Sequence, residues 1–290
     1  MKPHHKLLYG LLYVLSLMPF WLLYLLADVV YVLMYYLTGY RKKVVMDNMR
    51  RSFPNASPAQ LQRMVKDFYH NLADVTLESL KAISVSEAEL RKRVVFTNPD
   101  MPDGYTLQGI TTLSLTSHKC NWEWLLLAAN LNFKHTPVDA LYKPLTSEFV
   151  DALMLKVRSR FGAYMVADTQ VLRELAKRKT HVRTIAMVAD QTPAQEAPHK
   201  FMFLNQPTLF FAGPEKIGVT LQAPVLFADM NRVKRGHYTV TYYHVQDPPY
   251  DKANPGIVAG YVKLCEEAVL KQPHNWLWSH KRWKHKVTWP

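Results

Sequence analysis

The segment from His118 to Glu123 has the clearest chemical meaning in the sequence. It lies between a predicted strand at residues 111–116 and a predicted apolar helix at residues 122–130. On one continuous helix, residues five positions apart would point about 140° away from each other, because each residue turns the helix by about 100°. His118 and Glu123 can therefore meet only across a strand-to-helix turn, for which Asn121 is a suitable N-cap.

Such a pair would make His118 a general base. A carboxylate that accepts one imidazole N–H fixes the tautomer and leaves the other nitrogen free to take a proton from a hydroxyl. We therefore predict that Glu123 orients His118. A loop histidine near a favourable helix-start carboxylate is the commoner explanation when this spacing stands alone. The patterns around the pair must decide between the two.

Further polar residues follow other predicted strands. Asp190 and Gln191 come directly after the strand predicted at residues 184–189, at the sheet edge where ligands are expected, although Asp also suits a simple turn. Lys143 follows the strand predicted at residues 138–142. All three are candidate substrate-binding residues, and so is the capping residue Asn121.

Two arginines lie on or just after the helix predicted at residues 147–161. Arg158 and Arg160 are candidates for an anion site, because a guanidinium binds phosphate or carboxylate through two parallel hydrogen bonds. Arginines on a helix face are also commonly exposed to solvent without any ligand.

Strands and helices alternate along most of the chain. This order predicts an α/β fold with a mostly parallel central sheet and helices on both faces. A further helix is predicted to begin at Pro58 with Ser57 as its N-cap. Beyond the elements already given, strands are expected at 225–230 and 238–245, and helices at 170–178, 214–221 and 256–271.

The N-terminal segment is predicted to be a membrane anchor. Residues 7–37 are almost wholly apolar, with Asp28 as their only formal charge and Pro19 near their middle. About 20 apolar residues suffice to cross a bilayer, so the segment could span once or bend at Pro19 and lie partly in the interface. The basic residues that follow favour a cytoplasmic catalytic part on an anionic membrane surface. We expect an anchor at 1–40 and a catalytic domain at 41–290.

Composition limits the function further. The formal net charge of +13 indicates an anionic partner, which could be a nucleic acid, an anionic membrane or an acidic carrier protein. With only two cysteines there is no disulfide framework, and the twelve histidines show no metal-ligand spacing, so we expect no metal and no cofactor. The end of the chain mixes Trp with basic residues, which could stack on bases or, more simply, seat at the lipid headgroups.

Taken in order, these motifs resemble the bacterial lipid A late acyltransferases of the lysophospholipid acyltransferase group. The resemblance covers nearly the whole chain. It includes the apolar N-terminus, the His118–Glu123 segment and the residues listed here: Asn48 to Pro54, Tyr142-Lys143-Pro144, Arg158-Ser159-Arg160, Asp190-Gln191 and Trp278 to Trp283.

The resemblance implies an enzyme of the inner membrane that faces the cytoplasm. Its donor would be a fatty acyl thioester on acyl carrier protein, and its acceptor a hydroxyl of a lipid A precursor. His118 and Glu123 would be catalytic. Arg158 and Arg160 would steady a phosphate, and Asp190 would hold one of these arginines or a sugar hydroxyl.

Three alternatives remain open from the residues alone. Lys119 and Cys120 stand where this family usually has small residues, and this departure leaves room for a glycerophospholipid or an amino-acid lipid as acceptor. Cys120 and His118 could form a hydrolase pair, although a separation of two residues gives poor geometry. A basic membrane adaptor is the third alternative, but no recognised nucleic-acid motif supports a nucleic-acid partner.

Overall fold

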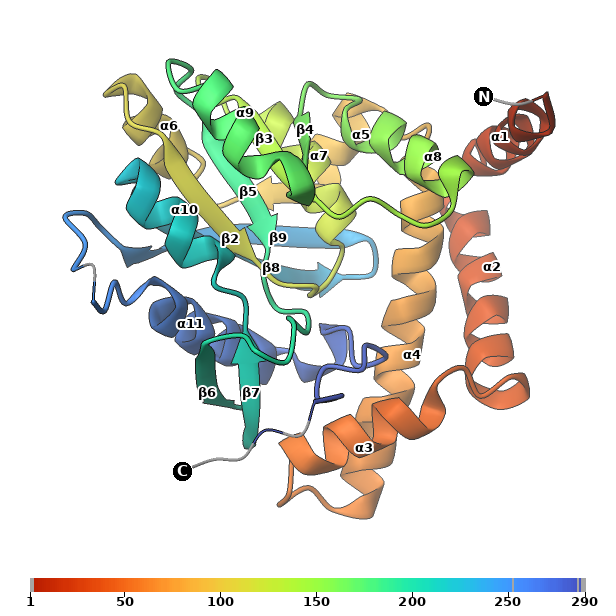
Figure 1. Cartoon of the computed structure of the whole chain (residues 1–290). Helices are drawn as coiled ribbons and strands as arrows, with labels where there is room; N and C mark the ends of the chain where they lie inside the picture. The colour runs from red at the N-terminus through yellow and green to blue at the C-terminus, as the bar shows by residue number, and fades with distance from the viewer. Residues whose placement is uncertain (1–2, 252, 286, 288–290) are drawn as a thin grey trace.

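The computed structural model describes residues 3–251, 253–285 and 287, and a mixed sheet lies at its centre (Figure 1). Its seven strands are β1 (Val94–Phe96), β2 (Thr112–Thr116), β3 (Val138–Tyr142), β4 (Tyr164–Ala167), β5 (Thr184–Val188), β8 (Val225–Lys234) and β9 (His237–Gln246). The spatial order is β1-β9-β8-β2-β5-β3-β4, in which β8, β2, β5, β3 and β4 are parallel and β9 is antiparallel to β8. The predicted α/β class and mostly parallel sheet are confirmed.

Helices cover both faces of this sheet. Along β8, Val225 and Phe227 belong to one hydrophobic core, whereas Leu226 and Ala228 belong to another, because successive side chains of a strand point to opposite faces. α10 and α11 complete the first core, and α5 and α7 the second. The bounds are α3 (Lys42–Ser52), α4 (Pro58–Lys81), α5 (Glu87–Arg93), α6 (Asp100–Leu107), α7 (Trp122–Asn132), α8 (Glu148–Arg158), α9 (Val171–Lys177), α10 (Gly213–Leu221) and α11 (Ile257–Lys271).

Several short elements were not predicted from the sequence. β1 and β4 have three and four residues, too few for a clear alternation of apolar and polar side chains. β6 (His199–Phe203) and β7 (Gln206–Phe210) form a separate hairpin whose two turn residues, Leu204 and Asn205, both have positive φ. The helix predicted after Ser57 is present, and Ser57 and Gln60 form the capping box at its start.

The N-terminal apolar segment bends at Pro19, which is one of the two arrangements that the sequence allowed. α1 (Pro3–Ser16) ends before Pro19, and α2 (Phe20–Val32) begins after it and continues as a π-helical turn, Leu33–Leu37. Lys81, at the end of α4, donates to the carbonyls of Ser16 and Met18 at 2.8 Å each. The carbonyls that the bend frees from helical bonding are therefore satisfied by the rest of the protein.

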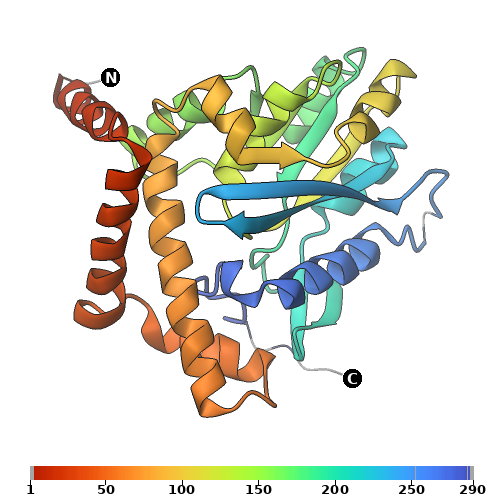
Figure 2. The same ribbon diagram turned by 180° about the vertical axis from the view of Figure 1, so that it is seen from behind.

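α2 packs along α4 and exposes its opposite face, as both views show (Figures 1 and 2). Its buried stripe is Leu23, Ala27, Tyr31 and Tyr35, spaced by four residues. In the part of the chain that the structure describes, one helical segment, Phe20–Leu37, is long and apolar enough to cross a membrane, with a mean hydropathy of 1.8 over 18 residues. The apolar side chains exposed on this segment include Trp21, Leu25, Val29, Val32, Leu33 and Leu37.

The Trp-rich C-terminal segment is buried, so its predicted place at the lipid headgroups is wrong for its two central tryptophans. Trp276 and Trp278 are only 2% and 0% exposed and pack into the core against Phe53 and Phe203. Asn48 in α3 holds this segment by donating to the backbone carbonyls of Trp278 and His280 at 2.9 and 3.0 Å. The residues of the Asn48 motif and the C-terminal motif are therefore partners.

Replacing Asn48 by Ala should destabilise the protein by about 1–3 kcal/mol, because the carbonyls that it satisfies would lose their donor. Chemical denaturation in detergent would measure the change. Asn55→Ala, on the exposed loop that follows α3, is the matched control and should be nearly neutral. Equal stability of the two variants would contradict this account of the C-terminal segment.

Candidate active site

The register between two parallel strands brings His118 to Asp190. Thr116, the last residue of β2, lies opposite Val188, the last residue of β5. Both chains leave the sheet at the same edge, so the residues two positions beyond each strand end are neighbours. The His118 Nδ1 atom lies 2.6 Å from Asp190 Oδ1, and the His118 backbone N–H donates to Asp190 Oδ2 at 2.9 Å.

Asp190 is buried and held as an anion. Its side chain is 2% exposed, and Oδ2 also accepts the Trp276 indole N–H at 2.7 Å. Burial raises the pKa of Asp190, but the charge and hydrogen bonds of His118, with the hydrogen bond from Trp276, outweigh it and leave the pKa below its usual value. An ionised carboxylate only accepts hydrogen bonds, so the ring proton of a neutral His118 lies on Nδ1.

The other ring nitrogen faces Gln191. The Gln191 side-chain amide nitrogen lies 3.0 Å from His118 Nε2. With Nδ1 protonated, Nε2 carries the lone pair and accepts this N–H. The His118 side chain is 16% exposed, so the ring is partly accessible.

The turn after β2 forms as predicted, with Asn121 as N-cap of α7. The Asn121 side-chain oxygen accepts the Trp124 backbone N–H at 2.9 Å. Cys120 adopts a left-handed conformation with φ of 56°, which turns the chain sharply before the helix. The buried Lys119 ammonium pairs with Asp229 and Asn231 of β8 at 2.8 and 2.9 Å.

The C-terminal segment closes this turn from the other side. Leu277 donates its backbone N–H to the His118 carbonyl at 3.0 Å, and Cys120 donates to the Asn275 carbonyl at 2.8 Å. Lys119 and Trp276 form an antiparallel bridge between these bonds. The backbone from His118 to Cys120 is thus hydrogen-bonded to the C-terminal segment.

Glu123 binds Arg158, and this finding corrects the predicted pairing with His118. Arg158 Nε and Nη2 donate to the two Glu123 oxygens at 2.8 and 2.6 Å. The first turn of α7 directs Glu123 toward the end of α8, whereas the strand register supplies Asp190 to the imidazole. Trp122 lies between the two sites, since its ring contacts His118 edge-on at 5.0 Å between centroids and its indole N–H donates to Glu123 at 3.2 Å.

Arg158 and Arg160, the predicted anion-binding arginines, both bind groups of the protein itself. Burial lowers the pKa of Arg158, but the hydrogen bonds and charge of Glu123 outweigh it and raise the pKa above its ordinary value. Arg160 donates to the carbonyls of Ala82 and Val85 beyond the end of α4. These two bonds hold the guanidinium group of Arg160 within the protein. Lys143 is exposed on the segment after β3.

The sequence predicts that Asp190 holds an arginine or a sugar hydroxyl. It did not predict the hydrogen bond between Asp190 and the His118 ring. The signal for this contact was present in the sequence, because His118 and Asp190 each follow a predicted strand, one ending at residue 116 and the other at residue 189. Cys120, the possible nucleophile, is fully buried and its thiol donates to the Met230 carbonyl. Burial raises the pKa of Cys120 to about 12, which leaves the thiol unreactive at neutral pH and argues against a Cys–His hydrolase.

Within residues 3–251, 253–285 and 287, no group of three or more His, Cys, Asp or Glu side chains gathers in a way that could hold a metal ion.

Residues 4–285 match the family described as bacterial lipid A biosynthesis acyltransferase. The chain belongs to this family. It is therefore an acyltransferase of lipid A biosynthesis, as the resemblance implied. A comparison with curated proteins gave no match.

Asp190→Asn should lower the acyltransferase activity strongly while the protein stays folded. The amide would no longer fix the Nδ1–H tautomer, and the corresponding change in a catalytic triad costs about 10⁴-fold. Acyl transfer by purified enzyme, with circular dichroism as the folding check, would measure this. Asp168→Asn on the exposed turn after β4 is the matched control. Activity within tenfold of wild type would refute the role of Asp190.

Proposed function

We propose that this acyltransferase moves a fatty acyl chain from the thioester of acyl carrier protein to a hydroxyl of a lipid A precursor, with His118 as the general base. The observation that carries the proposal is the pair of ring contacts of His118. Nδ1 is bound to a buried, ionised Asp190, and Nε2 carries the lone pair and faces the Gln191 amide, in a side chain that is 16% exposed. This arrangement suits a base that takes a proton from a bound hydroxyl.

In the proposed reaction, Nε2 removes the proton of the acceptor hydroxyl as its oxygen attacks the thioester carbonyl carbon. The tetrahedral intermediate then collapses, the carbon–sulfur bond breaks, and the leaving thiolate takes the proton back from the imidazolium. Asp190 stabilises the imidazolium through Nδ1 during these steps. No acyl group is attached to the protein, so no nucleophilic side chain is needed.

Gln191 takes part in the first step of the proposed reaction. Its amide occupies Nε2 in the substrate-free structure at 3.0 Å, so the acceptor hydroxyl must displace it. The amide N–H groups then become available for the oxygen that gains negative charge on the carbonyl, which is the stabilisation that acyl transfer requires. This role accounts for an amide beside the base without assigning it to proton transfer.

Glu123 and Arg158 form a wall of the site in this proposal and do not take part in proton transfer. The bidentate ion pair fixes Glu123, which accepts the indole N–H of Trp122, and Trp122 in turn packs on the His118 ring. Because Arg158 and Arg160 are engaged within the protein, the exposed Lys143 is the better candidate for a substrate phosphate.

The surface supports membrane association and a carrier-borne donor. The exposed apolar face of α1 and α2 is followed in the chain by four exposed basic residues on or next to α3, namely Arg41, Lys43, Arg50 and Arg51. We propose that this basic end rests on the headgroups at the cytoplasmic side of the bacterial inner membrane. The net charge of +13 also suits an acidic carrier protein.

His118→Ala should abolish acyl transfer and leave membrane association intact, because the ring supplies the base but is not one of the exposed apolar side chains of α2. The assay is transfer of a labelled acyl group from acyl carrier protein, together with sedimentation with membranes. His181→Ala is the control, since His181 is exposed on the loop after α9. A His118→Ala enzyme with full activity would end the general-base proposal.

The acceptor is tested by mass spectrometry of total lipids from cells that lack this protein. Loss of one acyl chain from lipid A is the expected result. A glycerophospholipid or amino-acid lipid acceptor is the alternative, and it would appear as a missing acyl chain on that lipid with lipid A unchanged.

A further inference from the structure

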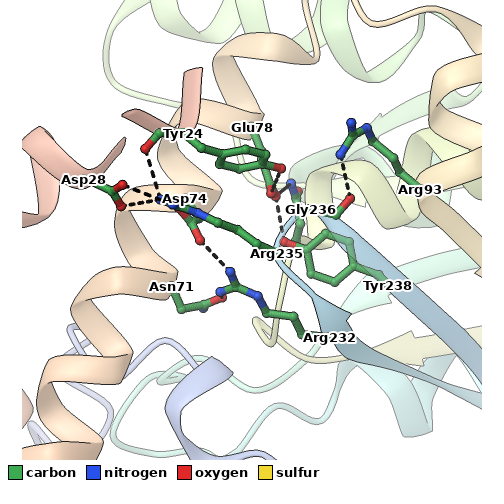
Figure 3. A network of polar contacts seen from close by, with 11 residues as sticks. Tyr24, Asp28, Asn71, Asp74, Glu78, Arg93, Arg232, Arg235, Gly236 and Tyr238 are labelled. Atoms are coloured by element: carbon green, nitrogen blue, oxygen red, sulfur yellow. Dashed lines mark hydrogen bonds and ion pairs between the residues drawn. The ribbon is translucent and has the colours of Figure 1, made fainter. Parts of the chain in front are cut away.

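A buried carboxylate outside the site described above joins the membrane-facing helix to the catalytic turn. Glu78 in α4 is 0% exposed, and three side chains donate to it: Tyr24 at 2.8 Å, Tyr238 at 2.7 Å and Asn121 at 2.8 Å. These donors come from α2, β9 and the turn before α7, so three distant parts of the chain meet at one carboxylate. Figure 3 shows Tyr24 and Tyr238 at Glu78.

The link from Glu78 to the active site is short. Asn121 uses its amide nitrogen on Glu78 and its oxygen on the Trp124 backbone N–H, so the same side chain fixes the start of α7 and is itself fixed by Glu78. The Glu78 backbone carbonyl also accepts the Trp124 indole N–H at 2.9 Å. His118 lies three residues before Asn121, and Glu123 lies two residues after it.

The link from Glu78 to the N-terminal helix depends on a close approach. The tip of the β8–β9 hairpin carries Gly236 with φ of +70°, and a Cβ atom there would lie 1.9 Å from the Tyr24 hydroxyl. Arg93 donates to the Gly236 carbonyl at 3.2 Å and lies over the Phe20 ring. Only glycine leaves room for Tyr24 to reach Glu78.

A second set of ion pairs holds the same helix one turn away. Arg235 bridges Asp28 of α2 and Asp74 of α4, and Arg232 also binds Asp74, at 2.6 Å (Figure 3). The side chain of Asp74 is 2% exposed, whereas those of Arg235 and Asp28 are 36% and 47% exposed, so the buried part of this set lies at Asp74. Through Arg235, Asp28 of α2 is thus linked to Asp74 of α4, which fixes the position of α2 along α4.

We propose that Glu78 is a positioning residue for acyl transfer and that Tyr24 of α2 completes its hydrogen-bond set, so the N-terminal helix supports the catalytic turn in addition to anchoring the enzyme. The inference rests on the proposed function of the His118 turn. Burial raises the pKa of Glu78, and the bonds from Tyr238, Asn121 and Tyr24 oppose this rise. Loss of the Tyr24 donor favours protonation of Glu78, and a neutral carboxyl group holds Asn121 less firmly.

Tyr24→Phe removes one hydroxyl group and tests the proposal directly. We expect kcat to fall about tenfold, because small misplacement of reacting groups is costly, while KM for both substrates changes less than about twofold. The assay uses detergent micelles and varies each substrate in turn while the other is saturating, and membrane binding is measured separately. Tyr243→Phe makes the same chemical change on an exposed residue of β9 and should keep wild-type kinetics.

Gly236→Ala tests the close approach by another route. Its added methyl group should displace the Tyr24 hydroxyl and lower kcat at least as much as Tyr24→Phe. Gly109→Ala is the matched control, because Gly109 also has a left-handed φ, +76°, but has no heavy atom within 4 Å of the added Cβ. The control carries the same backbone strain and should keep its kcat.

Glu78→Gln and its double variant with Tyr24→Phe complete the test. If both residues act through one carboxylate, their effects on kcat should be less than multiplicative. Independent, multiplicative effects, a kcat for Tyr24→Phe within twofold of wild type, or a loss of activity that follows the melting temperature would each overturn the inference. Inactive wild-type enzyme with acyl carrier protein and a lipid A precursor would instead refute the proposed function.

Discussion

The in-register parallel pairing of β2 with β5 is the constraint on which the site depends. It sets the two strand ends opposite each other, so that the segment after each strand leaves the sheet at the same place. A shift by one residue would reverse the direction of every side chain on the strand and separate the imidazole from its carboxylate. The hydrophobic residues Leu113, Leu115 and Ile185, all nearly fully buried, hold this register.

Around that pairing, three buried carboxylates receive several hydrogen bonds each. Asp190, Glu123 and Glu78 each receive two or more side-chain or backbone donors, and each joins segments that are far apart in the sequence. Such groups are costly to bury unless they are paired, so each set permits few alternative arrangements of the turn. The position of His118 is fixed by these neighbours.

Much of this arrangement could be predicted from the sequence, and the remainder shows where local patterns end. Helical spacing and the capping preference of Asn121 gave the strand-to-helix turn, and alternating strands and helices gave the fold class. The partner of His118 could not be derived from spacing within one segment, because a parallel sheet joins strands by long crossovers and the order β2-β5 is not sequential. The ion pair of Glu123 with Arg158 likewise joins two helices, and the spacing of residues within either helix does not predict it.

The pairing of the His118 turn with Asn275 and Leu277 also bears on the order in which the chain can fold. During synthesis the N-terminal apolar helices and the His118 turn are made before Asn275 and Leu277, the backbone partners of that turn. A partly made chain therefore lacks these partners and the indole N–H that Trp276 donates to Asp190. The contacts around His118 cannot be complete until the segment that carries Trp276 has been made.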